Sequence, residues 1–212
     1  MTSVLLVRHG QTDWNRDRIF RGRADVPLNA VGREEASRIG AALQGVNLDA
    51  AYSSPLSRAM ETARSILEAH RKKPQIAHGL IDIDYGAWQG MPLTEVQEQY
   101  PELYQRWREK PHEVAFPGGE RLDEVRERAL KVLKRICGRH PGKTVLIVSH
   151  RVVNKVLLCA VLDLGNEHFW NLKQENCALN LFDYSEEGFA IHLLNDTCHL
   201  ESIEEKFRGF DF

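Results

Sequence analysis

Two runs of mostly apolar residues, each ending abruptly at a polar cluster, constrain the fold of this chain most strongly. Val4–Val7 stops at Arg8 and His9, and Thr144–Ser149 stops at His150. A strand with one wet face alternates apolar and polar residues, whereas an unbroken apolar run is typical of a strand buried on both faces of a parallel sheet. The two runs therefore predict central strands of an α/β sheet.

The rest of the chain alternates between shorter strand-like runs and helical patterns. Further strands are predicted over 50–53, 179–184 and 189–194, the last two joined by a turn at 186–188. Apolar spacing predicts helices over 29–45, 57–70, 122–136 and 152–162, the first capped by Asn29. This order predicts a three-layer α/β sandwich, with a mostly parallel central sheet and helices on both faces. The length of 212 residues fits a single domain over 1–212.

The segment at about 86–119 breaks this rhythm and ends in Pro117-Gly118-Gly119. We interpret it as a helical, lid-like insertion. Its aromatic and apolar residues either set the substrate or pack the insertion onto the domain; they are Trp88, Met91, Leu93, Tyr100, Tyr104, Trp107 and Phe116. Trp170 belongs either to a dimer patch or to the core. The charged tail, 201–212, is expected to fray.

Composition excludes several classes of function. The 28 Lys+Arg and 30 Asp+Glu give a net charge of −2, which argues against nucleic acid as the main ligand. No apolar run approaches the ~20 residues of a membrane span, and Arg8 comes too early for a signal peptide. The four cysteines lie far apart without a C-x-x-C pair, so we expect free, mostly buried thiols in a reducing cytoplasm and no metal site; they are Cys137, Cys159, Cys177 and Cys198.

The polar clusters that follow the two central strands are the first candidates for a site. The carboxyl ends of parallel strands open onto one crevice, so His9 and His150 are expected to meet there. The alternative is that each histidine is an ordinary polar residue at a strand end. Five arginines follow or flank the first strand within sixteen residues, and guanidinium groups match phosphate oxygens. We expect only some of these five to reach a ligand, the others being solvated; they are Arg8, Arg16, Arg18, Arg21 and Arg23.

Several ordered blocks resemble one known family. The first block is Leu6-Val7-Arg8-His9-Gly10-Gln11-Thr12 with Trp14-Asn15, and later blocks are Ser53-Ser54-Pro55-Leu56-Ser57-Arg58-Ala59, Gly86-Ala87-Trp88-Gln89-Gly90, Pro117-Gly118-Gly119-Glu120, Val148-Ser149-His150 and Asn195-Asp196-Thr197. Together they resemble the histidine phosphatase superfamily, also called the phosphoglycerate mutase-like family. The closing block is similar to its phosphatase branch. The resemblance implies a phosphoglycerate mutase-like fold.

The resemblance also implies roles for individual residues. His9 would be the nucleophile and would form a phosphohistidine, and Arg8, Arg58 and His150 would hold the phosphoryl group with Asn15. Positioned cations can stabilise the charge on the three equatorial oxygens, so neither a metal nor another cofactor is expected. The remaining residues expected to bind substrate or phosphate are Gln11, Arg21, Gly22 and Arg151.

Three positions depart from the family pattern. Asp82 stands where the family usually has a glutamate, and we predict that it is the proton donor, protonated mainly in the substrate complex; Asp84 is the alternative. Arg151 replaces the usual glycine after the second histidine, so it either narrows the pocket or points away. Arg121 replaces a serine, and it either reaches an anionic substrate tail or caps a helix.

Three functions are compatible with these residues. The first is a metal-independent phosphomonoesterase acting on small phosphorylated metabolites, with water attacking the phosphohistidine. The second is a cofactor-dependent phosphoglycerate mutase, and the third a non-catalytic protein that binds phosphorylated ligands. Chain length, Gln11-Thr12 and the closing block favour the phosphatase, although Arg106-Trp107-Arg108 is similar to the mutase insertion. We expect a small phosphate monoester as the partner, no membrane, and a monomer or homodimer.

Overall fold

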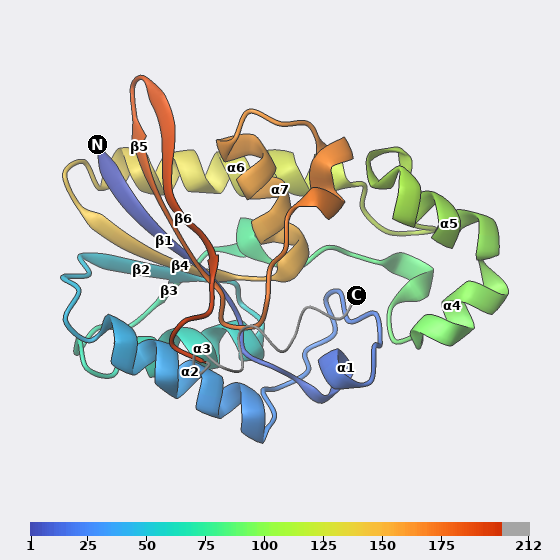
Figure 1. The fold of residues 1–212 in the computed structure, drawn as a ribbon, viewed down its shortest axis with the longest axis horizontal. Helices are drawn as coiled ribbons and strands as arrows, with labels where there is room; N and C mark the ends of the chain where they lie inside the picture. Colours follow the sequence, from blue (N-terminus) through green and yellow to red (C-terminus); the bar gives the residue numbers. More distant parts are fainter. Residues whose placement is uncertain (201–212) are drawn as a thin grey trace.

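A mixed sheet of six strands forms the centre of the molecule, in the order β3-β2-β4-β1-β5-β6 (Figure 1). The computed structural model describes residues 1–200. β1 pairs with β4, and β2 with β4 and β3, in parallel, whereas β5 pairs with both β1 and β6 in antiparallel fashion. The predicted parallel centre is confirmed, and the late hairpin extends it as an antiparallel edge. The strands are β1 (Thr2–Arg8), β2 (Ala50–Ser53), β3 (Gln75–Ile76), β4 (Thr144–Ser149), β5 (Leu179–Ser185) and β6 (Gly188–Asp196).

Helices cover both faces of this sheet, as predicted. One face carries α2 (Ala30–Leu43) and α3 (Ser57–Leu67), and the other carries α6 (Leu122–Arg139) and α7 (Arg151–Val161) (Figure 1). Successive side chains of a strand point to opposite faces. Leu5 of β1 therefore packs in the core under α2 and α3, and Leu6 packs in the core under α6 and α7. A strand covered on both sides has no wet face, which is why its sequence is continuously apolar.

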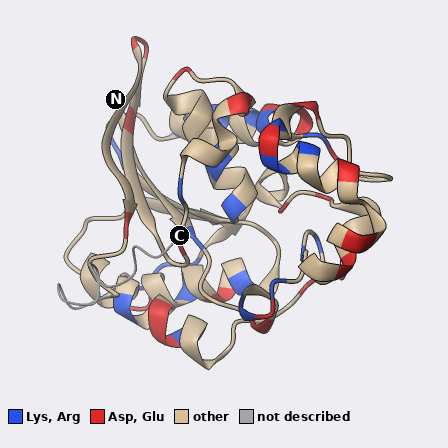
Figure 2. Ribbon diagram, turned by 45° about the vertical axis from the view of Figure 1, so that its right-hand side comes forward, with Lys and Arg blue, Asp and Glu red and all other residues tan. Residues whose placement is uncertain are grey.

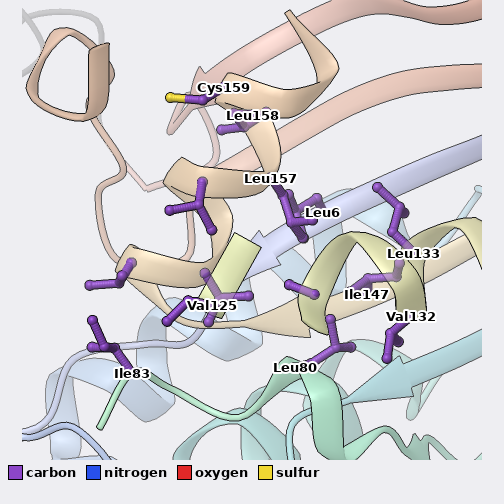
Figure 3. Close-up of a cluster of buried hydrophobic side chains, with 14 of the residues drawn as sticks. Leu6, Leu80, Ile83, Val125, Val132, Leu133, Ile147, Leu157, Leu158 and Cys159 are labelled. Carbon is purple, nitrogen blue, oxygen red and sulfur yellow. The ribbon is translucent and has the colours of Figure 1, made fainter. Parts of the chain in front are cut away.

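Figure 3 shows the packing on the α6 and α7 face. Leu6 and Ile147, from the neighbouring strands β1 and β4, contact the layer formed by Leu133 of α6 and Leu157 of α7. Leu80, from the turn before the insertion, joins the same cluster and is fully buried. This core holds the carboxyl ends of β1 and β4 side by side, which is where the polar clusters begin.

The insertion lies to one side of the sheet and is largely helical (Figure 1). It contains α4 (Leu93–Gln99), α5 (Pro101–Glu109) and 3-10 turns at Gly86–Trp88 and Pro111–Glu113. Most of its aromatic residues pack inward. Trp107 is 2% exposed, and its ring centroid lies 5.2 Å from that of Phe116 and 5.2 Å from that of Phe169 in the body of the domain. Aromatic contacts of this kind fasten the insertion to the α7 side of the domain.

The short elements and some helix ends differ from the expectation. The helix predicted over 57–70 ends at Leu67, and that predicted over 122–136 extends to Arg139. The single-turn helix α1 (Asp13–Arg16) and the two-residue strand β3 were not predicted, because one turn or one pair is too short to show periodicity. The 3-10 segment Asn166–Asn171 was missed for the same reason. The tail over 201–212 lies outside the described residues.

Trp170 contributes to the contact between the insertion and the body of the domain, and three of the four cysteines are buried. The indole nitrogen of Trp170 donates to the backbone carbonyl of Trp107, 2.7 Å away, so this side chain is part of the contact between the insertion and the body. Three cysteines are free and buried, and the fourth, Cys198, is exposed. Within residues 1–200 there is no helix of the length and apolar character that crossing a membrane requires.

Candidate active site

His9 and His150 lie side by side at the carboxyl edge of the parallel strands. β1 and β4 are in register with Arg8 opposite Ser149, so the histidine that follows each strand emerges at the same level. The two ring centroids are 5.1 Å apart, and both side chains are fully buried. The structure therefore brings these two residues together at this edge of the sheet, as expected.

A backbone carbonyl fixes the tautomer of His9. Its Nδ1 lies 2.6 Å from the carbonyl oxygen of Gly10, which can only accept, so Nδ1 carries the proton and Nε2 keeps its lone pair. Burial, followed by the charge of Arg58, holds the pKa of His9 well below 6.5. Nε2 is buried and has no hydrogen-bond partner within residues 1–200. The ring is thus a neutral imidazole whose Nε2 lone pair is not engaged by the described residues.

Two buried arginines flank the histidines. Arg8 donates through Nη1 to the carbonyl of Gln174 at 2.6 Å, and Arg58 donates to the carbonyls of Ala24 and Gly22, both at 2.8 Å. Burial lowers the pKa of Arg8 to about 9, which leaves it charged at neutral pH. These backbone contacts orient both guanidinium groups before any ligand binds, as a preorganised anion site requires.

Asp82 lies against the buried cluster of His9, His150, Arg8 and Arg58, which we call the floor of the site, whereas Asp84 does not. Oδ2 of Asp82 lies 3.3 Å from Nη2 of Arg58 and 3.6 Å from Nδ1 of His150, and the side chain is almost fully buried. Asp84 instead accepts from the backbone N–H of Gly86 and lies 3.4 Å from Arg23. The shorter side chain of aspartate therefore still brings a carboxylate to the histidine pair.

His150 is held by a serine that the sequence motif contained without a stated role. Its Nε2 lies 2.7 Å from Oγ of Ser54, the residue after β2. Burial, followed by the charge of Arg58, keeps the pKa of His150 well below 6.5, so this ring is also neutral. Thr62 of α3, in the block Glu61-Thr62-Ala63 that also fits the family pattern, was given no role; its hydroxyl accepts from the backbone N–H of Gly10 at 3.1 Å. The block marks this threonine as part of the family pattern, but helical spacing alone does not indicate which backbone group it contacts.

A cavity of about 350 Å³ lies beside this cluster and shares Asp82 with it, whereas His9, His150, Arg8 and Arg58 are not among its lining residues. Its walls come from the loop after β1, the insertion, and the α7 region, and basic positions occur on all three of these segments (Figure 2). The residues that line it include Trp14, Asn15, Arg18, Phe20, Arg21, Gly22, Asp82, Tyr85, Leu93, Tyr104, Trp107, Arg108, Arg151 and Trp170. Such a volume is at the small end of the range for ligand sites.

The other predicted site residues divide into those that line the cavity and those that do not. Asn15, Arg21, Gly22 and Arg151 line it, and burial lowers the pKa of Arg21 to about 10. Gln11 does not, because its side-chain oxygen accepts from Asn29 at 2.9 Å.

The structure also distinguishes between the two orientations considered for Arg151 and for Arg121. Arg151 points inward, since it lines the cavity together with Tyr85. Arg121 is exposed at the start of α6, where its backbone N–H donates to Glu124 at 2.7 Å. Arg121 therefore belongs to the beginning of the helix and not to the cavity wall.

A mixed α/β fold with two histidines and two arginines buried at the carboxyl edge of its parallel strands defines a phosphate-handling enzyme. A family model, that of the histidine phosphatase superfamily (branch 1), matches residues 4–197. The chain belongs to this superfamily, as the sequence blocks predicted.

Individual relatives support the phosphatase activity. Phosphoserine phosphatase 1 of Hydrogenobacter thermophilus is 38% identical over 200 residues, covering 94% of this chain and 95% of that protein. The 2-carboxy-D-arabinitol-1-phosphatase of Triticum aestivum is 35% identical over 183 residues. The match covers 86% of this chain and 37% of the wheat protein. The solved structure of Bacillus stearothermophilus YhfR shares 34% identity with a TM-score of 0.91, covering 95% of this chain and 100% of that one. The chain is a phosphomonoesterase of small phosphorylated metabolites.

Proposed function

We propose that this enzyme hydrolyses its substrate in two steps through a phosphohistidine at His9, without a metal. Nε2 of His9 forms a bond to phosphorus while the ester P–O bond breaks, and the leaving oxygen takes a proton from Asp82. Water then attacks the phosphohistidine and gives a proton to Asp82. The P–N bond breaks, inorganic phosphate leaves, and His9 and protonated Asp82 are restored.

The observation that carries this proposal is the state of the His9 ring. Only a neutral imidazole with a free lone pair can attack phosphorus, and burial together with the Gly10 carbonyl provides both conditions at Nε2. The position of Asp82 supports its role as acid, because its carboxylate is next to the histidine pair and lines the cavity through which an ester would enter.

Fixed donors would stabilise the transferred phosphoryl group. We assign this role to Arg8, Arg58 and His150 on the floor, with Arg21 and Asn15 at the cavity wall. Their charges and N–H groups are already oriented, so little reorganisation accompanies the reaction. Loss of one such donor typically lowers the rate by about 10²–10³-fold. Gln11 is a supporting residue of the loop and not a ligand contact in this proposal.

Trapping the intermediate tests the proposal. After acid-free quenching of a reaction with p-nitrophenyl phosphate, we expect phosphate bound to His9, detected by mass spectrometry of the peptide that contains it. His9→Ala should lose the adduct and the activity, whereas His192→Ala, at an exposed histidine of β6, should keep both. Full activity of His9→Ala would refute the proposal.

A separate assay with 3-phosphoglycerate and a bisphosphate primer distinguishes hydrolysis from mutase activity. We expect free inorganic phosphate. Formation of the isomeric phosphoglycerate without free phosphate would instead support the mutase.

We also propose that residues 1–212 form one domain that works in the cytoplasm as a monomer or homodimer, with the insertion acting as a lid over the cavity. The packing of Trp107 against Phe169 supports the single domain. The buried, free thiols of Cys137, Cys159 and Cys177 support a reducing compartment. A single cooperative unfolding transition and a sedimentation measurement of mass would test the domain and oligomer assignments.

A further inference from the structure

One arginine of α6, Arg128, holds the segment that carries Asp82. Its Nη1 donates to the backbone carbonyls of Gly79 and Ile81, at 2.9 and 2.7 Å, and its Nη2 donates to the carbonyl of Asp82 itself at 3.1 Å. Asp82 follows the 3-10 turn His78–Leu80 and belongs to neither a strand nor a helix. The position of its backbone therefore depends on these hydrogen bonds rather than on a regular ladder.

Glu120, in the loop before α6, fixes the guanidinium of Arg128 in turn. Nε and Nη2 of Arg128 donate to the two carboxylate oxygens of Glu120, both at 2.9 Å, as a bidentate pair. With the three carbonyls, this pair engages all five N–H groups of the guanidinium. Burial favours protonated Glu120, but hydrogen bonds from Arg128 and from the Asp84 N–H outweigh it and hold the pKa of Glu120 below its usual value. The pair is therefore charged at neutral pH.

Glu120 also holds the residues that follow Asp82. The backbone N–H of Asp84 donates to Oε2 of Glu120, and the N–H of Glu120 donates to the carbonyl of Asp84, both at 2.9 Å. Arg23, from the loop after β1, lies 3.0 Å from Oε1 of the same carboxylate. Arg128 and Glu120 thus fix the backbone on both sides of Asp82.

The carboxylate of Asp82 has little freedom of its own to correct a displaced backbone. Its side chain is shorter than that of glutamate and has fewer rotatable bonds. Oδ1 accepts from the N–H of Ile83 at 3.0 Å, and Oδ2 lies 3.3 Å from Arg58 and 3.6 Å from His150. A shift of the backbone is therefore passed on to the carboxylate, whereas a proton donor must lie within hydrogen-bond reach of the leaving oxygen.

We propose that Arg128, aligned by Glu120, is a positioning residue that keeps the Asp82 carboxylate within reach of the leaving oxygen. The inference rests on the proposed function, in which Asp82 protonates that oxygen. Arg128 acts through the backbone of Asp82 and not on the substrate, since it is absent from the described residues that line the cavity. Its loss should therefore slow proton transfer selectively and affect the attack by His9 much less.

Two esters with different leaving groups test the inference. The alkoxide of glycerol 3-phosphate needs a proton to leave, whereas p-nitrophenolate does not. Arg128→Gln can no longer bind Glu120 and the three carbonyls together, so its single-turnover rate with glycerol 3-phosphate should fall at least about tenfold more than that with p-nitrophenyl phosphate. Arg128→Lys keeps the charge without the planar fork and should show the same selective loss. Turnover of p-nitrophenyl phosphate shows that each variant is folded.

A neighbouring arginine on the same helix provides the matched control. Nη1 of Arg126 donates to the carbonyl of Leu164 at 2.6 Å, so Arg126→Gln also removes a contact from α6 to a backbone carbonyl, but in a loop that does not carry Asp82. It should change the two rates by the same factor. The double variant Asp82→Asn/Arg128→Gln gives a second readout, because with the proton donor gone the added Arg128→Gln should cause no further selective loss.

Three results would overturn the inference: an equal fall of both rates in Arg128→Gln and Arg128→Lys, the same selective loss in Arg126→Gln, or selective losses of Asp82→Asn and Arg128→Gln that add in the double variant. If Asp82→Asn alone shows the selective loss while the Arg128 variants do not, only the inference fails. If Asp82→Asn slows both esters equally, the proton-donor step of the proposed function fails, and the inference fails with it.

Discussion

Burial and a few short hydrogen bonds set the chemistry of the individual site residues. His9 and His150 both have a pKa well below 6.5, because burial removes hydration from the charged form and the nearby guanidinium groups repel it. The rings nevertheless differ, since Nδ1 of His9 faces a carbonyl and Nε2 of His150 faces a hydroxyl. Two neighbouring imidazoles can therefore act as nucleophile and as phosphoryl ligand.

Asp82→Asn should separate proton donation from binding. Asparagine keeps the size of the side chain but cannot protonate a leaving alkoxide, so the single-turnover rate with glycerol 3-phosphate should fall about 10²–10⁴-fold. p-Nitrophenolate leaves without a proton, and the rate with p-nitrophenyl phosphate should fall far less. Equal losses on both substrates would show that Asp82 acts only by positioning Arg58, 3.3 Å away.

Ser54→Ala should weaken the orientation of His150. The hydroxyl at 2.7 Å is the hydrogen-bond partner of Nε2, and its loss is expected to raise the barrier by about 1 kcal/mol, a fall of about fivefold in kcat/KM. Ser37→Ala, at an exposed serine of α2, is the matched control and should have no effect. An unchanged kcat/KM in Ser54→Ala would mean that packing alone holds His150.

At the scale of elements, close backbone contact between α2 and the loop after β1 positions the segment that carries His9. A Cβ atom added to Gly32 of α2 would lie 2.0 Å from the carbonyl oxygen of Gln11, and one added to Gly10 would lie 2.4 Å from the carbonyl oxygen of Gly32. Glu35 of the same helix accepts from the backbone N–H of Gln11 at 2.7 Å. The start of α2 thus supports the loop that carries His9.

Gly32→Ala should destabilise the fold and displace this loop. Overpacking against backbone atoms is expected to lower the free energy of unfolding by about 1–3 kcal/mol and to reduce kcat, measured by denaturant unfolding and by steady-state kinetics. Gly138→Ala is the control, because nothing lies within 4 Å of a Cβ at this position in α6. It should stabilise the helix by about 0.5–1 kcal/mol. If Gly32→Ala changed neither the free energy of unfolding nor kcat, α2 would be free to shift away from the loop.

At the scale of the whole molecule, Lys155 connects the α7 layer with the wall of the cavity. It is 4% exposed, and its ammonium lies 4.6 Å from the ring centroid of Phe169 and 4.5 Å from that of Trp170. Both rings favour the ammonium form, but burial, followed by the charge of Arg151, outweighs them and lowers the pKa to about 7 from 10.5. Between these two pKa values the unfolded chain binds more protons than the folded chain, so this group makes stability rise with pH.

Lys155→Met should reveal this linkage. Near pH 6 the wild type must bury a charged ammonium at position 155, whereas methionine is uncharged. The variant should therefore be more stable at this pH, by an amount on the order of a few kcal/mol. The advantage should shrink as the pH rises from about 7 to about 10, as measured by the Tm of both proteins. Lys131→Met, at an exposed lysine of α6, should give no pH-dependent difference. If the difference in Tm between Lys155→Met and the wild type did not depend on pH, the charge of Lys155 would not be what destabilises the folded protein.

Much of the fold was predictable because its signals are local. The apolar runs of β1 and β4, the Asn29 cap of α2 and the spacing in α6 each depend on a few consecutive residues. The meeting of His9 and His150 was also predictable, because the carboxyl ends of parallel strands share one edge. The sequence alone therefore specified the layers, the nucleophile candidate and the edge of the sheet on which the site is built.

The directions of the side chains in the loops depended on contacts distant in sequence. Asp82 and Asp84 are two residues apart, yet one faces His150 and the other Arg23, and no local pattern distinguishes them. Trp170 packs against Trp107 of the insertion, more than sixty residues away, and this contact holds Arg108 at the cavity. Periodicity indicates which face of a helix or strand is buried. The direction of a loop side chain instead depends on tertiary contacts with residues that are distant in the sequence.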